Sequence, residues 1–125
     1  MWIEYNPNPV ARRVRDCAVR ALAKALDISW EAAFASLTAM AFTMGDMPDS
    51  NAVWGAVLRD KGFYRKAVPD TCPRCYTAKD FCEDNPEGIY VLSFEGHVAT
   101  VVNGDLYDTG ASSECIPQYY WYKEE

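Results

Sequence analysis

The chain is 125 residues long, half of its residues are hydrophobic and 14% are aromatic, a composition that excludes a disordered protein and suits one packed domain over residues 1–125. The net charge of −6 argues against a nucleic-acid-binding surface. The longest nearly uncharged stretch, residues 32–44, is too short to cross a bilayer and no signal peptide is visible, so we expect a cytoplasmic protein that binds neither nucleic acid nor membrane.

The first half of the chain predicts three helices behind an extended arm. Residues 2–10 contain Pro7 and Pro9, which exclude a helix there. The three helices are expected over about residues 17–26, 30–43 and 50–61, with the candidate N-caps Asp16, Ser29 and Asp49 or Ser50. Apolar residues recur at helical spacing on the second and third helices and are expected in the core. They are Trp30, Ala33, Phe34, Leu37, Met40 and Ala41, followed by Val53, Trp54, Val57 and Leu58.

The second half of the chain favours strands. A short edge strand is predicted over residues 62–68, and Thr77 is expected to cap a short helix over 78–83. Alternating apolar residues then predict four strands over residues 89–94, 97–102, 106–109 and 118–122. Because helices precede strands, the pattern predicts an α+β fold in which N-terminal helices pack on a C-terminal antiparallel β-sheet.

Cys17 lies where the lead-in to the first predicted helix ends. The unpaired amides and positive end of a helix lower the pKa of a thiol below its free value of ~8.5, and nearby arginines act in the same direction. Since the thiolate is the nucleophile, we interpret Cys17 as a candidate nucleophile. The alternative interpretation is a small buried hydrophobic residue.

Five of the twelve cationic residues surround Cys17 in the sequence. One interpretation is a solvated helix face, and the other is a cationic rim that activates Cys17 or attracts acidic substrates. The five residues are Arg12, Arg13, Arg15, Arg20 and Lys24.

His97 is the only histidine in the chain and begins a predicted strand. The Asn103-Gly104 pair predicts a two-residue hairpin turn in which both φ angles are positive. In that register Asp108 shares a face with His97 and is its diagonal neighbour, so the carboxylate can orient the imidazole. The alternatives are a hydrogen-bonded strand histidine and a structural acid. The expected cross-strand pairs are Val102 with Asp105, Thr100 with Tyr107 and Ala99 with Asp108.

The order of these residues resembles the papain-like cysteine peptidase superfamily. Asp16-Cys17 opens a helix, Gly96-His97 begins a strand and Tyr107-Asp108-Thr109 follows on the next strand. The order Cys, His, Asp is that of the bacteriocin-leader-peptidase-like (C39-like) branch. Together with Asn6-Pro-Asn-Pro and Arg20-Ala-Leu, these motifs also resemble small proteins of gut bacteria and their phages.

The resemblance implies a papain-like fold and a catalytic triad. In it Cys17 would be the nucleophile, His97 the general base and then acid, and Asp108 the orienting residue, with the Cys17 amide as one oxyanion donor. Papain-like enzymes usually place a glutamine before the cysteine as a second donor, whereas this segment has none. The substitutes that the sequence offers for oxyanion or substrate binding are Asn6, Asn8, Arg12 and Gly96.

The other four cysteines are expected to be ordinary loop and core residues. The predicted compartment is reducing, so a disulfide framework is not expected. A zinc site is the alternative, because Cys72, Cys75 and Cys82 have workable spacing and Cys115 offers a fourth ligand. We expect no cofactor.

The sequence therefore favours a small cysteine hydrolase, a peptidase or isopeptidase that acts on a peptide or protein through an acyl-thioester. A transferase using the same intermediate and a non-catalytic protein-binding module, such as a phage or mobile-element factor, stay open. The binding module is considered because an aromatic segment could be exposed and contact a partner. The segment consists of Tyr119, Tyr120, Trp121 and Tyr122. The oligomeric state is left open.

Overall fold

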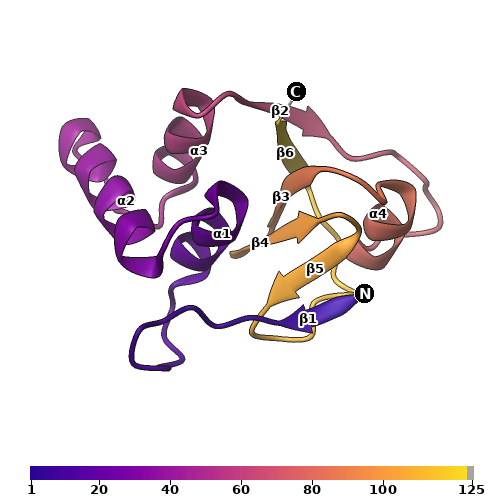
Figure 1. Cartoon of the computed structure of the whole chain (residues 1–125). Coiled ribbons are helices and arrows are strands. Elements are labelled where there is room, and N and C mark those ends of the chain that lie inside the picture. The colour runs from indigo at the N-terminus through magenta and orange to yellow at the C-terminus, as the bar shows by residue number, and fades with distance from the viewer. Residues whose placement is uncertain (124–125) are drawn as a thin grey trace.

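The computed structural model describes residues 1–123 and has an α+β architecture built on one sheet (Figure 1). The helices in this range are α1 (Cys17–Leu26), α2 (Trp30–Met44), α3 (Asn51–Asp60) and α4 (Ala78–Asp84). The strands are β1 (Trp2–Glu4), β2 (Phe63–Ala67), β3 (Ile89–Phe94), β4 (His97–Val102), β5 (Asp105–Asp108) and β6 (Tyr119–Lys123). The predicted helices and strands are thus confirmed, with ends that differ by one or two residues at several positions.

The sheet has the strand order β1-β5-β4-β3-β6-β2. Its neighbours are antiparallel except for β1, which pairs with β5 in the parallel direction. The strands that the sequence predicted therefore pair in the antiparallel sense expected, but the sheet is not made of them alone, because β1 adds a parallel edge strand. The N-terminal arm, expected to be extended, supplies this edge strand because β5 would otherwise leave its outer backbone groups unpaired.

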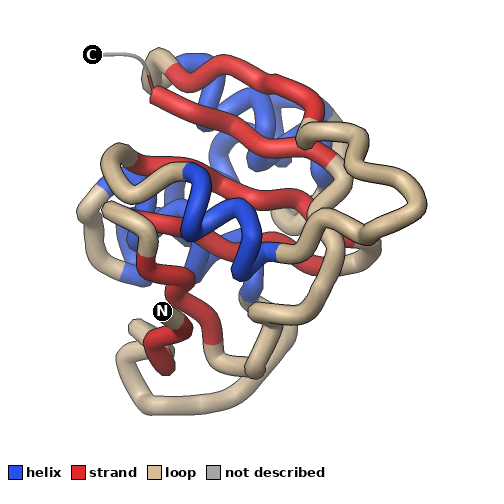
Figure 2. The backbone as a smooth tube through the Cα atoms, turned by 90° about the vertical axis from the view of Figure 1, so that its right-hand side faces the viewer, coloured by secondary structure: helices blue, strands red, loops and turns tan. Residues whose placement is uncertain are grey.

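Helices cover both faces of the sheet, as Figure 2 shows. Val91 and Val98 point to the face where α1, α2 and α3 pack, whereas their neighbours Leu92 and Ala99 point to the face of α4. This alternation follows from the two-residue period of a strand. The two faces therefore carry separate hydrophobic clusters, and α1 lies directly on β4.

Helix α2 contacts α1 and α3 and stands away from the sheet (Figure 1). Ala33, Leu37 and Ala41 are buried, but Phe34 is 45% exposed, so the predicted stripe is only partly in the core. The reason is geometric, since a helix that touches only two other helices buries a narrower face than one that lies on a sheet. On α3 the four predicted core residues are all buried.

The side chains of Ser29 and Thr77 cap their helices as predicted, accepting hydrogen bonds from the amides of Ala32 and Asp80. Asp16 is different. It precedes α1, but its carboxylate makes no capping hydrogen bond and turns to other partners. None of the helices within residues 1–123 has both the length and the apolar character needed to cross a membrane.

Candidate active site

The β4–β5 hairpin positions two of the three predicted catalytic residues. Asn103 and Gly104 have φ angles of 50° and 79°, as a two-residue turn of the predicted type requires. The observed register pairs Val102 with Asp105, as expected. Asp108 therefore ends β5 on the same face as His97, which begins β4.

The imidazole of His97 is hydrogen-bonded to Asp108. Its Nε2–H donates to Oδ2 of Asp108 over 2.5 Å, and the Asp108 side chain is only 1% exposed. The same carboxylate accepts hydrogen bonds from the Ser112 hydroxyl at 2.8 Å and from the Thr109 amide at 2.7 Å. With Nε2 occupied, the second ring nitrogen, Nδ1, is left to interact with another group.

Cys17 is the first residue of α1 and is half-buried. The helix is fixed to β4 by a buried hydrogen bond from the Thr100 hydroxyl to the carbonyl of Ala21, 2.7 Å long. This packing brings the thiol, eighty residues away in sequence, to His97 at the start of β4. The structure thus brings Cys17, His97 and Asp108 together, with His97 interacting with both of the others.

The surroundings of Cys17 favour its thiolate. Burial acts to raise the pKa of the thiol, but hydrogen bonds from His97 and from the Val98 amide, together with the positive charges of His97 and Arg20, outweigh it. The pKa of Cys17 is therefore lowered from its ordinary value. This is the behaviour expected of a nucleophilic thiol beside an imidazolium.

The pKa values of the other two residues shift in the complementary directions. The hydrogen bonds to Asp108 and to Cys17 raise the pKa of His97 to about 9 against the opposing effect of burial. For Asp108 burial acts to raise the pKa, but the hydrogen bonds from His97 and Ser112 prevail and lower it. The three shifts therefore act together in favour of a thiolate, an imidazolium and a carboxylate.

The first turn of α1 presents unpaired backbone donors beside the thiol. In residues 1–123 the amides of Cys17, Ala18 and Val19 donate no hydrogen bond to a protein acceptor, and Asp16 leaves them uncapped. Such amides are the groups that stabilise a negative oxygen as it forms next to a nucleophile. The arrangement is therefore suited to acyl transfer.

Of the four residues proposed for oxyanion or substrate binding, Asn6, Asn8 and Arg12 lie in the loop between β1 and α1, and Gly96 lies in the turn between β3 and β4. The Asn6 side chain donates to the carbonyl of Arg12 at 3.2 Å, and Oδ1 of Asn8 accepts from the amides of Val10 and Arg12 at 3.0 and 3.2 Å. These bonds fold the loop before Cys17. Gly96, with φ of 70°, makes the tight turn between β3 and β4. The side chains of Asn6 and Asn8 thus hold the loop before Cys17, and a part of these four residues in oxyanion or substrate binding stays a prediction.

The five cations near Cys17 do not form one surface. Arg20 is buried and contacts Asp16 and Asp108, whereas Arg13 is exposed and pairs with Glu4. Lys24 lies 4.0 Å from the centre of the Tyr107 ring. The group as a whole is neither a solvated face nor a rim, but one member, Arg20, does lower the pKa of Cys17, as the interpretation of activating cations expected.

Sequence reasoning missed the Asp16–Arg20 pair and the contribution of Ser112. An acid and an arginine four residues apart across a helix start were a usable signal for the pair. The bond from Ser112 to Asp108 had no comparable signal, because it depends on the path of the loop after β5.

The four remaining cysteines form no metal site among the described residues. Cys72, Cys75 and Cys115 are exposed and Cys82 is buried. Across residues 1–123 no three side chains of His, Cys, Asp or Glu are grouped so that they could hold a metal ion. The alternative of a zinc site therefore has no support in this part of the chain.

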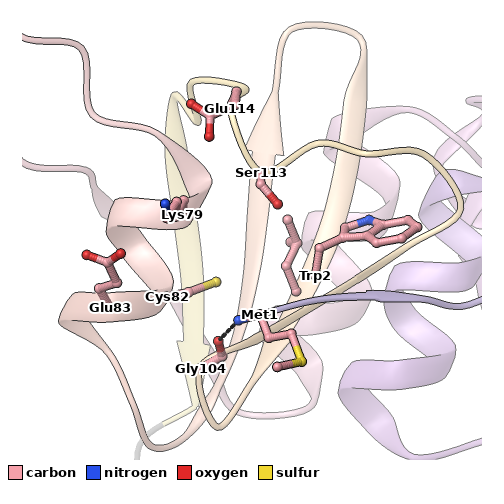
Figure 3. A pocket seen from close by; sticks show the side chains of 9 residues that line it. Met1, Trp2, Lys79, Cys82, Glu83, Gly104, Ser113 and Glu114 are labelled. Carbon is pink, nitrogen blue, oxygen red and sulfur yellow. Dashed lines mark hydrogen bonds between the residues drawn. The ribbon is translucent and has the colours of Figure 1, made fainter.

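Two cavities are relevant to a ligand. One of about 410 Å³ lies on the α4 side of the sheet, where Trp2, Cys82 and Leu106 line it and the Met1 amine donates to the carbonyl of Gly104 (Figure 3). The other is a groove of about 340 Å³ at the start of α1. Its lining includes both sequence neighbours of Cys17 and is otherwise largely apolar: Val14, Arg15, Asp16, Ala18, Val19, Trp30, Phe34, Met47, Pro48 and Asp49.

We compared the chain with protein-family models, with curated proteins and with solved structures, and none of the three comparisons finds a match.

Proposed function

We propose that the protein is a small cysteine hydrolase of the papain-like kind, a peptidase or isopeptidase that uses Cys17, His97 and Asp108. The observation that carries the proposal is the arrangement in which a buried carboxylate holds the imidazole and the imidazole interacts with a thiol at a helix start. The chain contains one histidine, and it lies between these two groups. If these residues had only structural roles, the positions of the thiol, the imidazole and the carboxylate next to one another would be a coincidence.

The geometry supports a two-step reaction. The Cys17 thiolate attacks the carbonyl carbon of the substrate, and the negative oxygen that forms is stabilised by the unpaired amides of the first turn of α1. His97 gives its proton to the departing amine as the carbon–nitrogen bond breaks, which leaves an acyl-thioester on Cys17. A water molecule then attacks the thioester while His97 accepts its proton, and the acid leaves as the thiolate reforms.

The groove at the start of α1 is suited to a side chain of the substrate. Asp16 and Ala18 line it, and Trp30 and Phe34 give it an aromatic wall. Cys17 and His97 lie outside its lining, so the groove would receive a residue next to the one that is cleaved. A groove of this size and apolar character is typical of ligand sites. We therefore propose a peptide or protein with a bulky apolar residue near the bond that is cleaved, in the cytoplasm.

Alkylation with iodoacetamide tests the proposal. At neutral pH Cys17 should react at least ~10-fold faster than Cys115, the exposed control, because His97, the Val98 amide and Arg20 lower the pKa of the Cys17 thiol. The variant His97→Ala should remove most of that advantage, whereas Ser113→Ala, a change in the cavity on the other face of the sheet, should not. Equal rates at Cys17 and Cys115 in the wild-type protein would contradict a catalytic role.

A non-catalytic protein-binding module remains the second candidate, and one observation favours it. Phe34, Met47 and Val14 are 45%, 66% and 39% exposed around the groove. The aromatic segment of β6 does not add to this surface, because β6 lies between β3 and β2 and Trp121 is buried. Replacing Cys17 by Ser separates the two candidates, since a binder keeps its partner and its biological effect, whereas a hydrolase or an acyl transferase loses its effect.

A further inference from the structure

Arg20 is a buried cation whose only charged partners among residues 1–123 are two buried acids. Its side chain is 7% exposed and forms ion pairs with Asp16 and, over 3.4 Å, with Oδ1 of Asp108. The side chains of Asp16 and Asp108 are 4% and 1% exposed. A charge is rarely buried without compensation, and this one joins the start of α1 to the end of β5.

With the catalytic residues, this cation completes a chain of alternating charges. It runs from Asp16 through Arg20 to Asp108, and from there through His97 to Cys17. Because Asp16 directly precedes Cys17 in sequence, the chain closes into a ring around the start of α1. Every ionic link in the ring joins opposite charges, so each one stabilises the charge state of the next.

Asp16 is held in the ring from two sides. Besides the ion pair with Arg20, its Oδ2 accepts a hydrogen bond of 2.9 Å from the indole nitrogen of Trp30 on α2. An aspartate at this position would ordinarily turn toward the first amides of the helix and cap them. Here the carboxylate is turned away, and the amides of Ala18 and Val19 stay unpaired.

We propose that Arg20 is a positioning residue, which holds Asp108 against His97 and, together with Trp30, keeps Asp16 from capping the amides beside Cys17. This proposal rests on the proposed cysteine chemistry, and it adds that the chemistry requires Arg20. Without Arg20, Asp16 is free to cap the first turn of α1. It would then occupy the donors that an oxyanion needs and bring a negative charge toward the thiolate.

The test is the pH dependence of Cys17 alkylation by iodoacetamide in the full chain. Arg20→Gln should move the midpoint of Cys17 reactivity upward by about one pH unit, because a nearby positive charge is lost and a negative one is freed. Arg20→Lys should give a smaller upward shift, since an ammonium keeps the charge but lacks the planar fork that reaches two carboxylates. The double variant Asp16→Asn/Arg20→Gln should recover part of the Arg20→Gln shift.

A second substitution keeps the test decisive if Arg20→Gln does not fold. Trp30→Phe removes one donor to Asp16 and leaves the ion pairs in place, and it should slow Cys17 alkylation at neutral pH about 2-fold. A wild-type midpoint that is lowered but unchanged in Arg20→Lys and Trp30→Phe would overturn the positioning role and leave the hydrolase intact. A wild-type midpoint at the ordinary thiol value would overturn both proposals.

Discussion

At the scale of single residues, the site depends on how the two ring nitrogens of His97 are shared between Asp108 and Cys17. His97 gives Nε2 to a carboxylate that is buried and already bound by Ser112 and Thr109, so the orientation of the ring is fixed before any substrate arrives. Pre-organisation of this kind is what a proton-transferring residue requires. The sequence could predict the pair because a two-residue turn leaves only one register for β4 and β5.

The raised pKa of His97 makes stability depend on pH. The hydrogen bond to Asp108 is the main cause, so the effect should persist in Cys17→Ser, which removes the coupled thiol. The folded pKa lies above the unfolded value of 6.5, so this stabilisation is complete below about 6.5 and is lost as the pH rises toward and through the folded pKa. Urea unfolding of Cys17→Ser across that range should show the fall.

The double variant Cys17→Ser/His97→Ala is the control for that experiment. Its free energy of unfolding should lack the His97-dependent part of the fall between pH 6.5 and about 9. If both variants lose stability equally over this range, the imidazole is not stabilised as its contact with Asp108 implies.

At the scale of elements, the hairpin turn and the helix start carry the site, and they differ in how far sequence predicts them. The Asn103-Gly104 turn is a local pattern and was predicted with its register. The side-chain partners of Asp16 were not, since a cap is the local expectation; the pair with Arg20 had a local signal in its spacing of four residues, but the bond from Trp30 arises only when α2 packs on α1. The parallel pairing of β1 with β5 was also missed, because it joins two segments that are far apart in the sequence.

The turn itself is testable with a matched pair of glycines. Gly104 has φ of 79°, and an added Cβ would lie 3.4 Å from the carbonyl oxygen of Cys82 and from Cα of Pro86. Gly104→Ala should therefore reduce the free energy of unfolding by about 1–2 kcal/mol. Gly110→Ala, where φ is not positive and nothing lies within 4 Å, should change it by less than ~0.5 kcal/mol. Equal effects in chemical denaturation would contradict the left-handed turn.

At the scale of the whole molecule, the sheet separates two hydrophobic clusters, and the candidate site touches both: Cys17 packs against the cluster that contains α1, and the His97 ring lies 5.8 Å from the ring of Phe94 in the other. The sequence predicted an α+β fold from the order of its elements. It could not predict that α2 would lie away from the sheet, because the apolar stripe of a helix is the same whether two helices or a helix and a sheet pack on it. The result is an exposed apolar surface beside the groove at the start of α1.

This placement of α2 predicts unequal costs for substitutions along one helix. Leu37 is fully buried, so Leu37→Ala should reduce the free energy of unfolding by about 2–5 kcal/mol. Phe42 is 89% exposed, and Phe42→Ala should change it by less than ~0.5 kcal/mol. Urea titrations of the two variants make the comparison, and a large loss in Phe42→Ala would mean that α2 packs with its other face inward.

The most direct test of the central claim is the ionisation of Cys17 in the wild-type protein, measured as its alkylation rate against pH with the other four cysteines as internal references. We expect a midpoint for Cys17 below the ordinary value of a thiol, lowered by His97, the Val98 amide and Arg20. In His97→Ala the midpoint should return toward that ordinary value. A wild-type midpoint at or above the ordinary thiol value would show that these groups do not activate Cys17.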